Sequence, residues 1–270
     1  MCLIFFASSE YEVSYGDVAL FPALFQDDVS RLCLDPVAAQ MGNERMEAMA
    51  ETKLLDFNIE KSCFIIIGKG KDKRRLKEEF KVSPPQIYGR NMTQSSEEKY
   101  LGEQIHTDGL SASVAATTEK RGGKVLKSIF EIRAILDDCR SHTVGGLSAG
   151  LDIWEIAVLP YLLNNSECWL SISDKSIKVL DKLQNQFYRV LLKVPTGCPT
   201  PALYWECGGL LIKYRIIKKK LEFLHHIANL DKSSLAYQIY DVQKKLMLPG
   251  LVEERQSYLV KFGLTKTEAY

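Results

Sequence analysis

The segment Phe25-Gln26-Asp27-Asp28 constrains the fold most strongly, because it lies between two apolar runs, Val18 to Phe25 and Val29 to Leu34. Unbroken apolar runs of this length are typical of strands covered on both faces, and the polar residues between them favour a turn. A tight turn would place the carboxylates of Asp27 and Asp28 at one rim of a buried sheet. We therefore predict a β-hairpin at this position.

Two adjacent carboxylates at a turn have two interpretations. Hard cations such as Mg²⁺ take oxygen ligands, and two-metal sites use carboxylates to hold the ions on either side of a reacting phosphate. Aspartate is also common in turns for structural reasons, because its side chain hydrogen-bonds its own backbone. Asp27 and Asp28 are therefore either candidate metal ligands for phosphoryl transfer or ordinary turn residues.

Three segments, in order along the chain, resemble a known family. Tyr15 to Asp28 resembles the catalytic palm hairpin of reverse transcriptases, particularly those of non-LTR retrotransposons, in which the hairpin reads aromatic, variable, Asp, Asp. Leu54 to Ser62 resembles the palm element with Phe-Asn and then Lys-Ser before a strand, and Tyr100-Leu101-Gly102 resembles the start of the primer-grip region. The later part of the chain resembles the family's helical thumb and the region after it. The matching residues are Trp169, Thr200-Pro201 and Trp205-Glu206-Cys207-Gly208.

The resemblance implies RNA-directed DNA synthesis, a nucleotidyl transfer, by a two-metal mechanism. It implies that Asp27 and Asp28 bind Mg²⁺ and that Lys61 lies near the nucleotide triphosphate, whereas the residues alone also allow Lys61 to be a solvated lysine beside a strand. Tyr100, Leu101 and Gly102 would support the primer end. The implied partners are an RNA template and a DNA primer, or their hybrid duplex.

The resemblance is incomplete at the N-terminus. Residues 1–24 contain no counterpart of the family's fingers or of its strand that carries a further catalytic aspartate, and Asp17 falls within the expected hairpin arm. An incomplete ligand set cannot clamp two metal ions, so we expect the chain alone to be inactive. Two alternatives are a non-catalytic remnant that binds nucleic acid or protein, and a translated reading frame without a selected activity.

Charge excludes a global attraction to nucleic acid, because 35 basic and 34 acidic residues leave a net charge of +1. The densest basic run is Lys69 to Lys81, in which Lys73, Arg74 and Arg75 are candidates for phosphate contacts. A solvated helix with internal ion pairs is the favoured alternative for this run. A second basic helix, Leu210 to Ala228, is equally compatible with a nucleic-acid contact and with a solvated surface.

Composition indicates a globular protein from a reducing compartment. The chain is 46% hydrophobic and 26% charged, and its seven cysteines are odd in number and include no Cys-x-x-Cys pair. Met1 to Ala7 is apolar without a basic leader, and no apolar run approaches the roughly 20 residues of a membrane span. We expect an intracellular protein of the cytoplasm or nucleus, neither secreted nor inserted in a membrane.

The predicted fold class is α+β, with a partial polymerase palm over residues 1–110, an all-α thumb over 111–194 and a helical extension over 195–270. The hydrophobic periodicity of the sequence places the individual elements. We predict a strand over Ser62 to Ile67, a loop over Ser83 to Ser96 before a strand at Tyr100 to Gly102, an extended linker at Pro195 to Pro201, and helices over Asn43–Leu55, Ser113–Arg140 with a break at Gly122-Gly123, Asp152–Leu163, Lys175–Lys193, Leu210–Ala228 and Leu235–Leu246.

Overall fold

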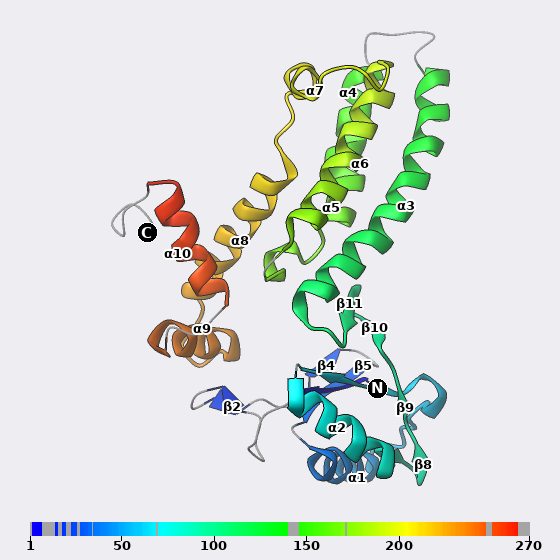
Figure 1. The fold of residues 1–270 in the computed structure, drawn as a ribbon, viewed down its shortest axis with the longest axis vertical. Coiled ribbons are helices and arrows are strands. Elements are labelled where there is room, and N and C mark those ends of the chain that lie inside the picture. The colour runs from blue at the N-terminus through cyan, green and yellow to red at the C-terminus, as the bar shows by residue number, and fades with distance from the viewer. Residues whose placement is uncertain are drawn as a thin grey trace. The chain divides into compact units, whose positions relative to one another are not determined.

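The chain folds as a mixed α+β protein that is about 67% helical with small sheets, which confirms the predicted class at this coarse level. The computed structural model describes residues 2–6, 14–15, 18–19, 23–25, 28–33, 35–68, 70–139, 146–170, 172–246 and 250–263 (Figure 1). Two compact units are present: unit 1 is Met1–Ser113 with Asp231–Leu246, and unit 2 is Val114–Leu230 with Met247–Tyr270. The finer division at residues 110 and 194 stays a prediction.

Unit 1 contains a five-stranded sheet. Its strand order is β4 (Ala23–Phe25), β5 (Asp28–Cys33), β1 (Cys2–Phe6), β6 (Cys63–Ile67) and β9 (Thr93–Gln94). β1 runs parallel to both β5 and β6, and β6 runs parallel to β9. β4 and β5 pair antiparallel. The central strands of unit 1 are therefore parallel, and an antiparallel strand lies at one edge.

The predicted hairpin is confirmed, because Phe25 pairs with Asp28 and Ala23 pairs with Ser30. Its first arm differs from the prediction of one continuous strand. β3 (Val18–Ala19) instead pairs with β2 (Ser14–Tyr15) in a separate small sheet. The turn residues Gln26 and Asp27 lie outside the described residues.

Two helices pack on the sheet of unit 1. α1 (Pro36–Thr52) begins well before the predicted start at Asn43, because Asp35 caps it by accepting a hydrogen bond from the Ala38 N–H at 2.7 Å and Pro36 fits the first turn. α2 (Gly70–Val82) follows β6. The buried core between helices and sheet comprises Cys33, Ala39, Phe64, Ile66, Leu76, Phe80, Ile87 and Met92.

The region after α2 is more regular than predicted. The expected loop contains β7 (Gln86–Ile87) paired with β8 (Arg90–Asn91), followed by β9. β10 (Glu97–Tyr100) and β11 (Glu103–His106) form a hairpin. The predicted strand at Tyr100 to Gly102 is wrong beyond its first residue, because Leu101 and Gly102 have positive φ angles of 46° and 87° and form the turn. α9 (Leu235–Leu246) completes unit 1.

Unit 2 is helical. Its longest element is α3, which begins in unit 1 and continues without interruption. The elements are α3 (Leu110–Cys139), α4 (Gly146–Ile153), the π-helix η2 (Trp154–Val158), α5 (Leu159–Leu162), the 3-10 helix η3 (Ser166–Cys168), α6 (Asp174–Leu192), α7 (Thr200–Cys207), α8 (Ile212–Ala228) and α10 (Leu251–Lys261).

Two predicted interruptions are wrong. α3 passes through Gly122 because this glycine lies against α6, where a Cβ atom would come within 3.1 Å of the Leu183 Cδ1. The predicted linker at Pro195 to Pro201 includes the start of α7, because Pro201 occupies its first turn, where a missing N–H costs no helical hydrogen bond. A glycine pair therefore does not interrupt a helix where the glycine packs closely against another helix, and a proline does not exclude a helix when it lies in the first turn.

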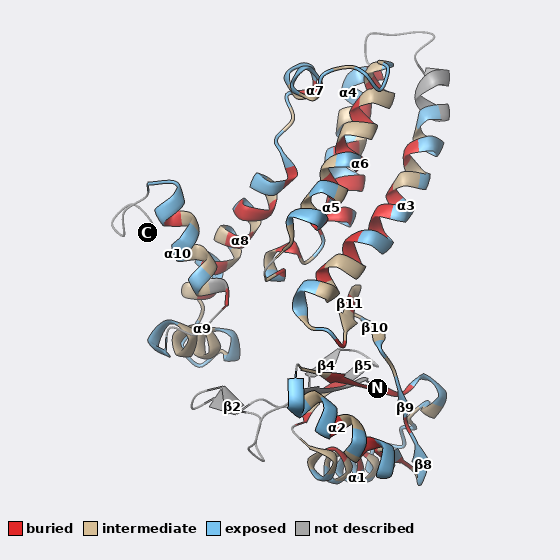
Figure 2. Ribbon diagram, viewed as in Figure 1, coloured by how far each residue is buried: buried red, intermediate tan, exposed pale blue. Residues whose placement is uncertain are grey.

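The core of unit 2 is centred on α6. The bounds of α6 agree with those of the predicted amphipathic helix, Lys175–Lys193, to within one residue at each end, which confirms that prediction. Its buried stripe includes Leu180, Leu183 and Phe187. The Trp154 ring stacks on Phe187 with 4.7 Å between ring centroids, and Trp154 is fully buried. Figure 2 shows buried residues repeating along one side of α3 and α6.

A buried polar network joins α6 to α7 and to the start of α8. The Gln184 amide nitrogen donates to the Tyr188 hydroxyl at 2.7 Å and to the Leu210 carbonyl at 3.1 Å. The Tyr204 hydroxyl donates to the Gln184 amide oxygen at 3.3 Å. Burial raises the pKa of the Tyr188 hydroxyl above its ordinary value. Burial of hydrogen-bonded groups specifies how these three segments pack.

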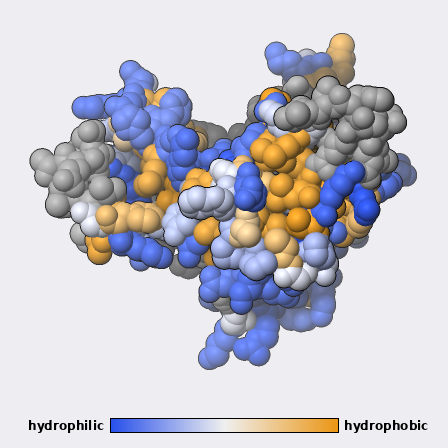
Figure 3. Space-filling model, turned by 90° about the horizontal axis from the view of Figure 1, so that it is seen from above, coloured by the Kyte–Doolittle hydropathy of each residue, from blue (hydrophilic) through white to orange (hydrophobic). Residues whose placement is uncertain are grey.

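The surface also carries apolar side chains. Trp205 on α7 is 86% exposed and Ile156 on η2 is 77% exposed. Figure 3 shows apolar residues gathered among hydrophilic ones on one face of the molecule. Among the described helices, none combines the length and the apolar character that a bilayer crossing requires.

Candidate functional site

Two of the predicted palm residues, Asp28 and Lys61, lie near one edge of the unit 1 sheet. Asp28 is the first residue of β5 and lies two positions before Ser30. Lys61 ends the 3-10 helix η1 (Ile59–Lys61) and lies two positions before Cys63 of β6. Both Ser30 and Cys63 are register partners of Cys2 in β1. Asp28 therefore begins β5, and Lys61 lies two residues before β6, and both strands flank the same central strand β1.

This arrangement sets the spacing of β5 and β6. Adjacent strands lie about 4.8 Å apart, so positions on either side of β1 are about 10 Å apart across the sheet. Asp28 and Lys61 are distant in sequence, yet the parallel pairing places both at the edge where β5, β1 and β6 begin. Lys61 is exposed there, and the Asn58 side chain accepts a hydrogen bond from its backbone N–H.

The described central strand β1, Cys2–Phe6, contains no acidic residue.

The candidate primer-supporting residues belong to a different sheet. Tyr100 closes the β10–β11 hairpin by pairing with Glu103, and Leu101 and Gly102 form the connecting turn. A positive φ is unusual for leucine and Leu101 is 41% exposed, so its side chain stands at the tip of the hairpin. The structure does not bring this tip into the five-stranded sheet that carries Asp28 and Lys61.

The candidate phosphate-binding residues lie near the start of α2. β6 ends at Ile67 and α2 begins at Gly70, so this end of α2 is at the opposite end of β6 from Lys61. The Lys73 ammonium donates to the Thr107 carbonyl at 2.7 Å and to the Asp108 carboxylate at 2.9 Å. Its side chain is only 14% exposed, so Lys73 stabilises the turn that precedes α3.

The other two α2 candidates differ from Lys73. Arg75 pairs with Glu79 one turn along the helix at 2.8 Å, as the solvated-helix interpretation expects. Glu78, four residues after Arg74, pairs instead with Lys81 at 2.8 Å. Arg74 is exposed. Of the three candidates, Arg74 is therefore the best placed for an external phosphate.

The implied magnesium site is incomplete in the part of the chain that the structure describes. No group of three or more histidine, cysteine, aspartate or glutamate residues in that part is arranged to hold a metal ion. Asp27 lies outside the described residues, and β1 contributes no carboxylate. The described residues alone do not provide the ligands of a two-metal centre.

The basic face of α8 is largely neutralised within unit 2. The Arg215 guanidinium donates to both carboxylate oxygens of Glu155, at 2.8 and 2.6 Å. Lys219 pairs with Glu167 at 2.9 Å, and Lys220 pairs with Glu254. These intramolecular pairs favour the structural interpretation of the α8 cations over a nucleic-acid contact.

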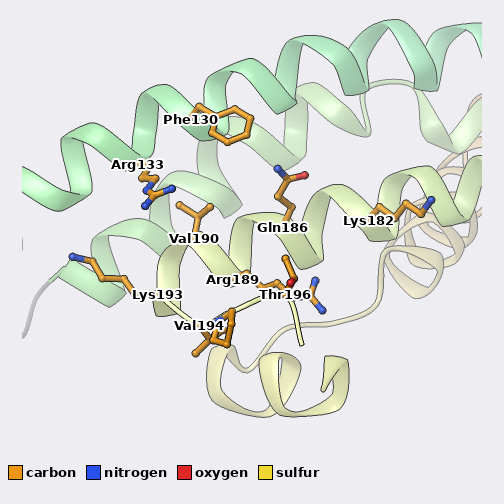
Figure 4. A pocket seen from close by; sticks show the side chains of 10 residues that line it. Phe130, Arg133, Lys182, Gln186, Arg189, Val190, Lys193, Val194 and Thr196 are labelled. Atoms are coloured by element: carbon orange, nitrogen blue, oxygen red, sulfur yellow. The ribbon is translucent and has the colours of Figure 1, made fainter. Parts of the chain in front are cut away.

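Unit 2 also contains a groove that the sequence analysis missed. Its volume is about 940 Å³, and it is lined by α3, by α6 and by the segment that follows α6 (Figure 4). The sequence contained part of the signal, because Lys182, Gln186 and Arg189 recur at helical spacing on α6. The contribution of Phe130 and Arg133 from α3 depends on tertiary packing and has no local signature.

Comparison of the chain with protein-family models, with curated proteins and with solved structures found no match.

Proposed function

We propose that this chain is a reverse-transcriptase-like fragment derived from a retrotransposon, containing the back of a palm and a helical thumb. The observation that carries the proposal is the shared sheet edge of Asp28 and Lys61. The family resemblance assigns these two residues to one nucleotide site, and both lie near the edge of the sheet where β5 and β6 begin. The antiparallel β4–β5 hairpin adds further support.

The fragment is inactive by itself under this proposal. Two-metal phosphoryl transfer requires carboxylates that hold both ions, and the described residues provide an incomplete set. The parent polypeptide would synthesise DNA on an RNA template, whereas this chain would retain the positions of the site residues but would not catalyse the reaction.

Sequencing the transcript and the genomic DNA upstream of the Met1 codon tests the origin of the chain. We expect upstream codons for fingers and for a strand-borne aspartate, either in frame or separated by a stop or frameshift. An in-frame extension would make Asp27 and Asp28 catalytic ligands of a longer enzyme. Upstream DNA that encodes neither element in any frame would overturn the proposal.

Primer extension with the purified chain tests the inactivity. We expect no magnesium-dependent extension of a DNA primer on an RNA template, either for the unaltered chain or for Asp28→Asn. Extension by the chain that Asp28→Asn abolishes would show that the ligand set is complete, contrary to the proposal.

A second candidate function is nucleic-acid binding without catalysis, which the exposed Arg74 favours. Binding of an RNA–DNA hybrid should then weaken steeply with salt, because each phosphate contact releases condensed counterions. We expect Arg74→Gln to weaken binding and to reduce the salt slope by about 0.9, whereas Asp28→Asn leaves both unchanged. Lys81→Gln is the matched control, because Lys81 lies in the last turn of α2 and pairs with Glu78. Salt-insensitive or absent binding would contradict this function.

A further inference from the structure

The groove of unit 2 combines cations with apolar surface. Arg133 comes from α3, Lys182 and Arg189 come from α6, and Lys193 follows α6. None of the described lining residues is acidic. A groove lined by one sign of charge attracts ligands of the opposite sign more strongly than a flat surface does. The expected ligand is therefore anionic.

The apolar part of the lining lies among these cations. Phe130 is 52% exposed, and its ring faces α6 in Figure 4. Val190 points from α6 toward α3, and Val194 and Pro195 continue the apolar lining beyond the helix end. Lys182 and Lys193 lie at opposite ends of the set in the same view. An apolar centre with a polar rim is the arrangement that protein-binding sites use.

The end of α6 holds the groove in shape. Lys193 caps the helix in the left-handed conformation with φ 55°, and its backbone N–H donates to the Arg189 and Val190 carbonyls. The Val194 N–H also donates to the Arg189 carbonyl at 3.1 Å. The Arg189 guanidinium donates to the Cys198 carbonyl at 3.3 Å. These bonds fix the segment that carries Val194 and Pro195, so the groove exists before a ligand binds.

The Arg189 side chain retains an unsatisfied donor. Its Nε is buried and has no acceptor among the described residues. Guanidinium groups bind carboxylates through two parallel hydrogen bonds, and a buried donor without an acceptor is unfavourable. Arg189 lines the groove, so its guanidinium charge adds to the attraction for a carboxylate ligand.

We propose that this groove binds an acidic amphipathic peptide segment of a partner protein. Lys182 and Lys193 are separated by about 16 Å along α6, which matches about 11 residues of a peptide helix. Apolar side chains of such a helix would pack on Phe130, Val190 and Pro195, and acidic side chains on its flanks would meet Lys182 and Arg189. The proposal does not depend on a reverse-transcriptase origin.

A nucleic-acid strand fits the groove less well. It would satisfy the cations, and one base could stack on Phe130. Its sugar-phosphate backbone would leave Val190, Val194 and Pro195 without apolar partners. The mixed chemistry of the lining therefore favours a peptide with both acidic and apolar side chains.

Fluorescence anisotropy with the full chain tests the proposal. The probe is the fluorescein-labelled peptide Glu-Leu-Asp-Glu-Phe-Leu-Glu-Asp-Leu-Phe-Glu, whose apolar residues recur at helical spacing. We expect saturable binding in the micromolar range. Phe130→Ala and Lys182→Gln should each weaken binding about tenfold, because both remove side chains from the centre or rim of the site. A peptide with serine at every apolar position should bind at least about tenfold more weakly.

Lys218→Gln is the matched control, because Lys218 lies on α8 with a side chain that is 70% exposed and is outside the groove. It removes the same charge as Lys182→Gln, and we expect less than a twofold change, roughly 0.4 kcal/mol. Equal weakening by the two lysine variants would show non-specific charge attraction and overturn the proposal. Absence of saturable binding would also overturn it.

Two further measurements separate the remaining explanations. Far-UV circular dichroism should be unchanged by Phe130→Ala, because this side chain is half exposed; should that variant misfold, Lys182→Gln alone decides. An oligothymidylate probe is titrated in parallel. Tighter binding of oligothymidylate that depends on Phe130 and Lys182 would assign the groove to nucleic acid and overturn the peptide proposal.

Discussion

Trp154→Ala should destabilise unit 2 by about 3–5 kcal/mol, the usual cost of truncating a large buried aromatic side chain. Trp154 is fully buried in η2, stacks on Phe187 and lies 6.2 Å from the Tyr188 ring centroid. Removing the indole would leave a cavity in the centre of the α6 core. The surrounding helices are joined by the Gln184 network and cannot collapse freely into that space.

Denaturant unfolding followed by tryptophan fluorescence measures this effect. All three tryptophans lie in unit 2, and the buried Trp169 remains as a reporter after Trp154 is replaced. Ile156→Ala is the matched control, because Ile156 is on the same π-helix but is 77% exposed. We expect the control to change the free energy of unfolding by less than about 0.5 kcal/mol. Similar effects of the two variants would contradict the central position of Trp154.

Glu254→Ala should also cost unit 2 about 3–5 kcal/mol, because it leaves a buried charge without its partner. The Lys220 side chain on α8 is 1% exposed, and its ammonium pairs with the Glu254 carboxylate on α10. An isolated ammonium is poorly solvated in such a position. The expected result is a large drop in the free energy of unfolding, measured by the same fluorescence assay.

Two further variants distinguish burial of charge from loss of a surface ion pair. Glu222→Ala removes the partner of Lys218, whose side chain is 70% exposed, and should cost less than about 1 kcal/mol. Lys220→Met combined with Glu254→Ala should recover much of the lost stability, because methionine fills a similar volume without a charge. A double variant that is no more stable than Glu254→Ala would show that the buried charge is not the cause.

Sequence patterns predicted the amphipathic helices well, because their signals are local. The stripe of Leu180, Leu183 and Phe187 predicted α6 to within one residue at each end. The start of α1 was also encoded locally, in the Asp35 cap followed by Pro36, but the prediction relied on the later methionine spacing. This error arose from the choice of signal, not from tertiary structure.

Other errors arose because distant contacts override local preference. Gly122 predicted a helix break, yet it allows α3 and α6 to approach each other closely. Gly209 shows a similar constraint, because a Cβ atom there would come within 2.2 Å of the Tyr188 hydroxyl oxygen. Neither role is visible in the residues that flank the glycine. The presence of a helix was thus easier to predict from the sequence than the packing role of each glycine.

The candidate sites were predictable only in part. The sequence identified Asp28 and Lys61 individually through the family resemblance, but their position at one sheet edge depends on β1 pairing with both β5 and β6. Long-range pairing of this kind has no local signature. Lys73 and Arg74 are neighbours in sequence, and only the fold shows that Lys73 holds the Thr107–Asp108 turn while Arg74 is exposed. Charge patterns alone do not distinguish the two roles.

Unit 1 is assembled from two stretches of chain, because α9 belongs to it and follows residues 114–230 of unit 2. During synthesis the N-terminal residues leave the ribosome first, and α9 emerges only after residues 114–230. At ordinary elongation rates this delay is on the order of ten seconds. The helical core around Trp154 and α6 can therefore form on the nascent chain while unit 1 still lacks its final helix.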